Sequence, residues 1–130
     1  MDPAVKKAVA VIALLVVGTW GMGVDAFTRV WIHYNYSQFE QGSPFHIASN
    51  YVMQHLIEDT PNDPNRNYAV EYPGSPKVYG KATCSLQIDK LECLDCLSDA
   101  LDWRDTVYPA AMGVNVQYDV CTFRYEGYKF

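Results

Sequence analysis

The stretch CSLQIDKLECLDC, residues 84–96, contains three of the four cysteines of this 130-residue chain, and their role decides the fold. Eight residues separate Cys84 from Cys93, two separate Cys93 from Cys96, and Cys121 stands apart near the C-terminal end. Four thiols can form a metal cage, a redox pair or structural crosslinks. The cellular compartment, and the place of each cysteine on its element, distinguish these roles.

Residues 1–26 have the pattern of a secretory signal peptide. Two lysines precede an uncharged apolar run, residues 8–17, and small residues then lead to Ala26, after which we expect cleavage. The alternative is an uncleaved membrane anchor, because residues 8–24 carry no charge and approach the lower limit of about 17 residues for a spanning helix. Three glycines and the short apolar run favour cleavage. We therefore expect residues 27–130 to be secreted into the extracellular space, the apoplast.

An extracellular location favours disulfides over the other two roles of the cysteines. Cysteines of secreted proteins usually form disulfides, and an even number of cysteines leaves none without a partner. A zinc cage usually has two close ligand pairs, whereas Cys121 has no near neighbour, and the three histidines form no metal-binding motif. The Cys93–Cys96 spacing resembles a redox motif but lacks the βαβ setting of such motifs. We expect crosslinks, with no metal and no cofactor.

The rest of the sequence predicts an α+β fold. Alternating apolar residues indicate strands, and apolar residues three or four positions apart indicate helices. Ser43 is a suitable cap for the first helix, and Asp89 with Glu92 forms a capping box for the second. The predicted strands occupy residues 30–36, 68–72, 78–83 and 114–125, and the predicted helices run from Pro44 to about Glu58 and onward from Asp89. An antiparallel sheet with two helices packed on it satisfies this order.

The second helix places its two cysteines on the apolar face, where they point at the core. Cys93 and Cys96 share this face with leucine and alanine residues at helical spacing, so neither suits an exposed reactive thiol. Cys84 is a short loop away from Cys93, and Cys121 lies on the last predicted strand, within reach of Cys96. Those two bonds would tie the helix to the sheet, whereas the alternative bond, Cys93–Cys96, would only close a turn.

Composition excludes several classes of function. The net charge is −5, and removing the signal peptide leaves it unchanged, because two lysines and two aspartates leave together. Nucleic acid and anionic membranes are therefore not expected partners. No G-x-S-x-G motif, free Cys/His pair or glycine-rich phosphate loop occurs, and we expect no enzyme activity. We expect Asp99 and Asp102 on the exposed side of the second helix, where they add solubility.

Two longer segments resemble the ginkbilobin family, the plant cysteine-rich secretory or stress-antifungal domain. The segment YGKATCSLQIDKLECLDCLSDAL carries the family hallmark C-x8-C-x2-C at Cys84, Cys93 and Cys96, and the segment GVNVQYDVCTFRYEGYKF follows it as in the family. The segment YNYSQFEQGSPF resembles the N-terminal segment of the family. The resemblance extends over residues 27–130, which we expect to form a single domain. It implies an antiparallel sheet of about five strands, two helices, and the disulfides Cys84–Cys93 and Cys96–Cys121.

The sequence departs from the family at one bridge. Family members typically have six cysteines in three bridges, and the positions of the third bridge align with Tyr34 and Tyr108. Both halves of that bridge are absent together, so no thiol is left without a partner. Because tyrosines can pack and hydrogen-bond, we expect Tyr34 and Tyr108 to contact each other and recover part of the lost stability.

The resemblance also implies a sugar site. Certain ginkbilobin-like antifungal proteins bind mannose through an Asn, an Arg and a Glu, which align with Asn35, Asn115 and Glu126. An amide and a carboxylate suit sugar hydroxyls, but Asn115 lacks the guanidinium fork of the family arginine. The predicted function is a monomeric, secreted plant defence lectin that binds mannose or the mannan of fungal walls and inhibits fungi. The alternative is an extracellular interaction module in which the sugar site is degraded.

Two observations on Asn35 and Glu126 compete with the sugar site. Asn35-Tyr36-Ser37 is an N-glycosylation sequon, and a glycan on Asn35 would block the amide that the lectin needs. Sugar binding and glycosylation at Asn35 are therefore mutually exclusive. In the structural alternative, Asn35 is only a turn residue and Glu126 is a solvated strand residue.

Overall fold

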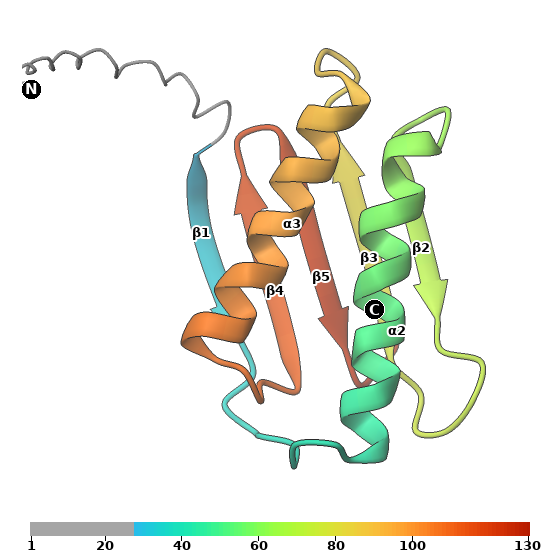
Figure 1. Cartoon of the computed structure of the whole chain (residues 1–130), viewed down its shortest axis with the longest axis vertical. Helices are drawn as coiled ribbons and strands as arrows, with labels where there is room; N and C mark the ends of the chain where they lie inside the picture. Colours follow the sequence, from blue (N-terminus) through green and yellow to red (C-terminus); the bar gives the residue numbers. More distant parts are fainter. Residues whose placement is uncertain (1–27) are drawn as a thin grey trace, which may run out of the picture.

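The computed structural model describes residues 28–130, so the predicted signal peptide, residues 1–26, lies outside the described residues. Its elements are β1 (Arg29–Tyr34), α2 (Pro44–Asp59), the 3-10 turn η1 (Thr60–Asn62), β2 (Asn67–Glu71), β3 (Tyr79–Cys84), α3 (Lys90–Val107), β4 (Gly113–Tyr118) and β5 (Cys121–Glu126). Both helices lie on the same face of a five-stranded antiparallel sheet (Figure 1), so the predicted α+β architecture is confirmed. Within residues 28–130, no helix is long and apolar enough to cross a membrane.

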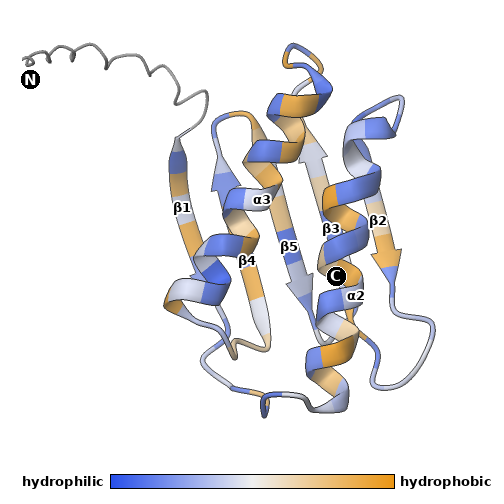
Figure 2. Cartoon of the chain, in the orientation of Figure 1, coloured by the Kyte–Doolittle hydropathy of each residue, from blue (hydrophilic) through white to orange (hydrophobic). Residues whose placement is uncertain are grey.

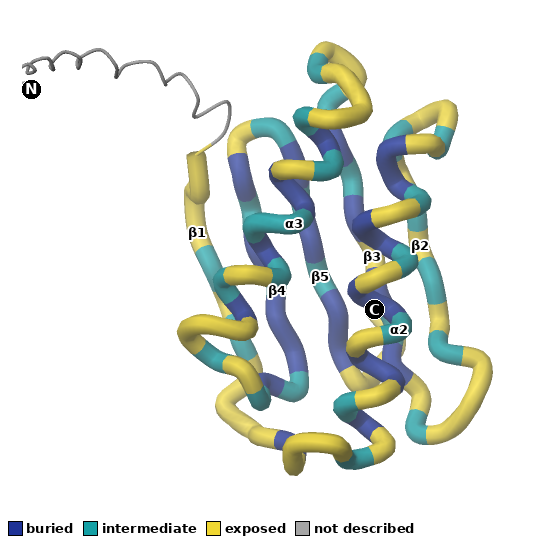
Figure 3. The backbone as a smooth tube through the Cα atoms, viewed as in Figure 1, coloured by how far each residue is buried: buried dark blue, intermediate teal, exposed yellow. Residues whose placement is uncertain are grey.

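The strands are ordered β1-β4-β5-β3-β2, and every neighbouring pair is antiparallel. Strands β4 and β5 are mostly buried, β3 is buried at every second position, and the two edge strands are more exposed (Figure 3). The hairpin of β2 and β3 is confirmed. The single strand predicted at residues 114–125 is wrong, because Asp119 and Val120 form a turn between β4 and β5. Across this turn the residues that face the core change from even-numbered positions, which end at Tyr118, to odd-numbered positions, which begin at Cys121.

The two helices begin where their caps were predicted. The Ser43 hydroxyl accepts a hydrogen bond from the His46 backbone N at 3.2 Å, and Pro44 occupies the first turn of α2. At the start of α3, the Asp89 carboxylate accepts from the Glu92 backbone N at 2.8 Å, and Glu92 accepts in return from Asp89 N at 3.3 Å. These bonds satisfy backbone donors that have no partner within the helix.

Each helix packs an apolar stripe against the sheet. Apolar and polar residues alternate around α2 and α3 as successive turns pass toward and away from the strands (Figure 2). Val52 and Leu56 of α2 approach β3 so closely that a Cβ on Gly80 would lie 2.3 Å from Val52 Cγ1. A glycine is required there because any larger residue would push the helix away from the sheet.

Two disulfides join α3 to the centre of the sheet. Cys84 is bonded to Cys93 and Cys96 to Cys121, with Cα–Cα distances of 5.7 Å and 6.3 Å, and no cysteine of the described residues is free. Cys84 and Cys121 lie directly opposite each other on β3 and β5. The pairing implied by the family resemblance is confirmed, and the alternative Cys93–Cys96 bond is excluded.

Tyr34 and Tyr108 form the contact that we expected in place of a third bridge. Their rings are stacked with centroids 3.8 Å apart and planes 28° apart, and the Tyr34 hydroxyl donates to the Tyr108 oxygen at 2.7 Å. The pair joins the end of edge strand β1 to the C-terminal cap of α3. The hydrogen bond to Tyr108, followed by burial, raises the pKa of the Tyr34 phenol above its ordinary value.

The expectation for Asp99 is wrong, whereas Asp102 is exposed as predicted. Asp99 accepts a hydrogen bond from the Tyr118 hydroxyl and lies 3.6 Å from Arg29 Nε. Burial, followed by this hydrogen bond, raises the pKa of Tyr118. The Tyr118 ring is buried, so its hydroxyl needs a hydrogen-bond acceptor within the protein. Asp99 supplies this acceptor, and its side chain therefore points toward the sheet.

We expect the Cys96–Cys121 bond to stabilise the domain more than the Cys84–Cys93 bond. The first spans a sequence separation of 25 residues and the second only 9, so it restricts the unfolded chain more. Chain entropy predicts losses of about 3.5 and about 2.5 kcal/mol for the corresponding Cys→Ala double variants. Guanidinium unfolding of the two oxidised double variants would measure the difference, and the reverse ranking would contradict this explanation.

Tyr34 and Tyr108 are expected to be energetically coupled. In a double-mutant cycle of Tyr34→Ala and Tyr108→Ala, the stacked rings and the shared hydrogen bond should give about 1 kcal/mol of coupling in the free energy of unfolding. The same cycle with Phe in place of Ala isolates the hydrogen bond, because the rings then remain stacked. Additive losses in the Ala cycle would show that the contact does not replace any part of a bridge.

Candidate functional site

The sheet face that points away from the helices brings three strands together at a polar site. Side chains alternate between the two faces of a strand, and on β5 the residues between the buried ones point away from the core. Asn115 of β4 lies opposite Arg124 of β5 on one side and opposite His33 of β1 on the other. The register of the sheet therefore places His33, Asn115 and Arg124 in one row.

A hollow of about 280 Å³, the open-face hollow, lies at this row. It is lined by His33, Tyr34, Asn35, Asn115, Arg124, Glu126 and Tyr128. The three residues predicted from the family resemblance, Asn35, Asn115 and Glu126, are thus brought together in one place. They come from the turn after β1, from β4 and from the end of β5.

Two neighbours fix the position of Glu126 at the hollow: Arg124, which carries the opposite charge, and Gly113, which has no side chain to occupy the space of the carboxylate. It is only 7% exposed, so the alternative in which Glu126 is merely a solvated strand residue is wrong. Its Oε2 lies 3.1 Å from Arg124 Nε, a charge-assisted hydrogen bond that offsets the cost of burying the carboxylate. A Cβ on Gly113 would lie 2.0 Å from Glu126 Oε1. Only glycine at position 113 leaves room for the carboxylate in this position.

Arg124 is a site residue that the sequence reasoning missed. Besides Glu126, its guanidinium donates from Nη2 to the Tyr128 hydroxyl at 3.2 Å and lies 4.0 Å from the centre of the Phe130 ring. No described residue hydrogen-bonds Arg124 Nη1, so this nitrogen can donate to a ligand. Strand alternation could have identified Arg124, because it lies two residues before Glu126 and so shares its face.

Asn35 acts as a turn residue and also forms part of the wall. Its Oδ1 accepts from the Ser37 backbone N at 2.9 Å, the Asx turn that ends β1. Its own backbone N donates to Gly113 O at 2.8 Å, which places it beside the hollow. The side-chain amide nitrogen has no partner among the described residues. That nitrogen can donate to a ligand, or, as the acceptor of a sequon, carry a glycan.

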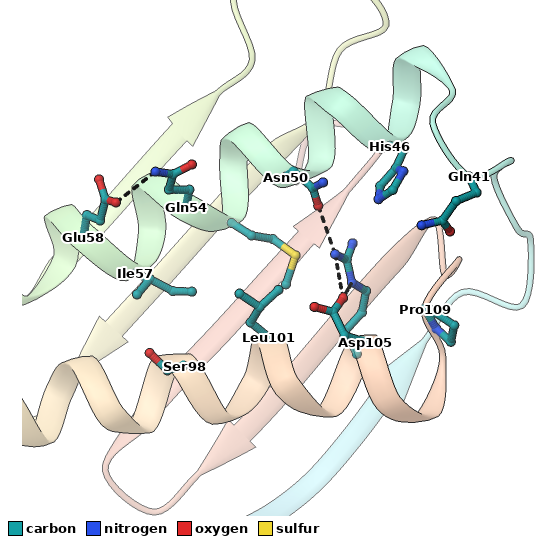
Figure 4. Close-up of a pocket in the computed structure, with 12 residues that line it drawn as sticks. Gln41, His46, Asn50, Gln54, Ile57, Glu58, Ser98, Leu101, Asp105 and Pro109 are labelled. Carbon is teal, nitrogen blue, oxygen red and sulfur yellow. Dashed lines mark hydrogen bonds and ion pairs between the residues drawn. The ribbon is translucent and has the colours of Figure 1, made fainter.

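A larger hollow, about 630 Å³, lies between the helices α2 and α3 (Figure 4). It is lined by Gln41, His46, Asn50, Met53, Gln54, Ile57, Glu58, Ser98, Leu101, Arg104, Asp105 and Pro109. Asn50 and Asp105 point toward each other from the two helices in Figure 4, and the buried Arg104 bridges them. No residue predicted to bind sugar lines this hollow.

Arg104 has a structural role in the larger hollow. Its side chain is 2% exposed, and it donates to Asp105 at 2.9 Å, to Asn50 at 3.0 Å and, over longer distances, to Ser49 and Tyr125. Its guanidinium also lies 5.8 Å from the centre of the Tyr125 ring. With its donors engaged, Arg104 links both helices to β5.

Residues 28–130 contain no group of three or more His, Cys, Asp or Glu residues that could hold a metal ion.

The chain thus forms a small disulfide-bonded α+β domain with a polar hollow on its open face. Residues 33–128 match the family described as salt stress response/antifungal, and the chain belongs to this family. The resemblance to the ginkbilobin family is thereby confirmed.

Two curated relatives cover most of the described domain. The chain is 29% identical to the antifungal protein ginkbilobin-2 of Ginkgo biloba, over 74% of this chain and 73% of the relative. It is 33% identical to an antifungal ginkbilobin-like protein of Picea abies, over 74% of this chain and 90% of the relative.

Two solved structures show the same fold. They are the tandem DUF26 ectodomains of the Arabidopsis thaliana cysteine-rich receptor-like proteins PDLP5 and PDLP8, with TM-scores of 0.71 and 0.67 and identities of 20% and 19%. Each match covers 78% of this chain but only 51% and 50% of the ectodomain. The chain therefore spans about half the length of these tandem ectodomains.

Proposed function

We propose that this domain is a secreted antifungal lectin of the apoplast, which binds mannose or mannan in the open-face hollow as a monomer. One observation carries the proposal: Asn35, Asn115 and Glu126, far apart in the sequence, line the same hollow. The antifungal role is supported by the family and by the names of the Ginkgo and Picea relatives. Two intact disulfides suit an oxidising extracellular compartment.

The chemistry of the hollow suits neutral sugar hydroxyls, which both donate and accept hydrogen bonds. Glu126 supplies an acceptor, Asn35 and Asn115 supply amides, and Arg124 supplies donors in a planar fork. Asn115 replaces the arginine that the family resemblance implies, and Arg124 stands directly opposite it on β5. In this proposal, the guanidinium lost from one strand is replaced by one from the neighbouring strand.

A titration of mannose and mannan into the oxidised protein tests the proposal. The protein should carry Ser37→Ala, which removes the sequon, while the Asx turn is kept because it uses the Ser37 backbone N. Calorimetry or amide chemical shifts should then show saturable binding of mannose. Absence of binding at millimolar sugar would overturn the lectin and favour the interaction module without a sugar site.

Arg124→Ala should weaken mannose binding about tenfold or more, because a lost hydrogen bond to a charged group costs about 1.5–3 kcal/mol. Gly113→Ala should also weaken binding, since it displaces the Glu126 carboxylate. Lys81→Ala is the matched control, because Lys81 lies opposite Arg124 on β3 but outside the hollow. Equal losses in Arg124→Ala and Lys81→Ala would contradict a specific role for Arg124. Growth inhibition of a fungus should follow the same order.

The wild-type chain needs one further measurement, because a glycan on Asn35 and a sugar in the hollow cannot coexist. Intact mass before and after glycosidase treatment, on protein secreted by plant cells, reports the state of Asn35. A fully glycosylated protein would contradict the lectin in its natural form, even where the Ser37→Ala variant binds mannose.

A further inference from the structure

The Tyr34–Tyr108 contact has the geometry of a reactive pair as well as of a packing contact. The two rings are stacked at 3.8 Å between centroids, and the two phenolic oxygens are 2.7 Å apart. When ring centres and hydroxyls are both in contact, the rings point the same way, and the ortho carbons beside the hydroxyls face each other. Both side chains are half-buried, so they are held in place yet open to solvent on one side.

We propose that Tyr34 and Tyr108 are a site of oxidative crosslinking, at which a peroxide and a peroxidase join the two rings into dityrosine within one chain. The proposal does not depend on sugar binding. It requires only an oxidising compartment that supplies hydrogen peroxide and an enzyme that uses it.

The reaction balances with one peroxide for each crosslink. Each phenol loses one electron and one proton to become a phenoxyl radical. The two radicals combine through a new carbon–carbon bond between their ortho carbons. The hydrogen on each of these carbons then moves to a phenolic oxygen, which restores both aromatic rings. The two electrons and two protons reduce hydrogen peroxide to two molecules of water, so the protein loses two hydrogen atoms.

Other tyrosine pairs within residues 28–130 lack this geometry. Tyr34 and Tyr36 meet edge-to-face at 4.9 Å and 69°, and Tyr51 and Tyr72 do so at 5.2 Å and 74°. An edge-to-face contact directs the edge of one ring at the face of the other and does not place their ortho carbons side by side. The Tyr34–Tyr108 pair is stacked, so coupling should be specific to it.

The backbone around the pair can accommodate a new bond. Tyr34 is the last residue of the edge strand β1, and Tyr108 is the C-terminal cap of α3, outside the regular helix. Small shifts at these two ends leave the central strands in place. The product would tie β1 covalently to the segment after α3, across 74 residues of chain.

The experiment uses the Ser37→Ala protein, which carries no glycan, with both disulfides formed. The protein is treated with hydrogen peroxide and a plant peroxidase at low protein concentration. We expect a monomer lighter by two hydrogen atoms, dityrosine fluorescence and, after disulfide reduction and proteolysis, a peptide that links Tyr34 to Tyr108. Tyr34→Phe and Tyr108→Phe should lose this product, because the ring stays stacked but one phenol is gone. Tyr36→Phe and Tyr72→Phe are the matched controls and should retain it.

A second readout is the unfolding temperature, which should rise after treatment in the Ser37→Ala protein and stay unchanged in the protein that also carries Tyr108→Phe. Crosslinks through Tyr36 or Tyr72, or crosslinks only between molecules, would overturn the proposal. So would persistence of the monomeric crosslink in Tyr108→Phe, or treatment that oxidises other residues and leaves Tyr34 and Tyr108 unlinked.

Discussion

The attachment of helix α3 to β3 and β5 through two disulfides is the constraint on which the other features of the domain depend. Cys84 and Cys121 lie opposite each other in the sheet, and Cys93 and Cys96 share one helix face, so the bonds run side by side. One bond fixes a single point of the helix, whereas two bonds also fix its direction along the sheet. Because β5 also carries Arg124 and Glu126, the strand that supplies these two residues to the candidate site is anchored from the helix side of the sheet.

The edge strand β1 is held by weaker forces. It pairs only with β4, and its end is joined to α3 by the stacked phenols of Tyr34 and Tyr108. A contact of this kind contributes less than a disulfide and can open without chemistry. The wall of the hollow formed by Tyr34 and Asn35 therefore rests on a reversible contact, while the opposite wall rests on the central strands.

The cysteine spacing and the helix caps predict much of the fold, because both depend on residues close in sequence. Asp89 and Glu92 cap α3 whatever surrounds them, and Cys93 and Cys96 face one way on any helix. The turn at Asp119 contains no glycine or proline, so it is marked only by one aspartate and by the shift of the buried residues from even to odd positions. The contact of Asp99 with Tyr118, and those of Arg104 with α2 and β5, could not be predicted, because these partners lie on other elements. Asn35, Asn115 and Glu126 were identified by resemblance. That they line one hollow, and that Arg124 lies beside them, follows from the register of the strands.

The segment after β5 folds back onto the site. Tyr128 hydrogen-bonds the Arg124 guanidinium and Phe130 stacks on it, so the cation of the hollow is positioned by residues that belong to no strand. Substitution of Tyr128 or Phe130 would alter the surroundings of Arg124 while the sheet and both disulfides stayed intact. A well-folded protein with an altered segment after β5 would therefore present a different site.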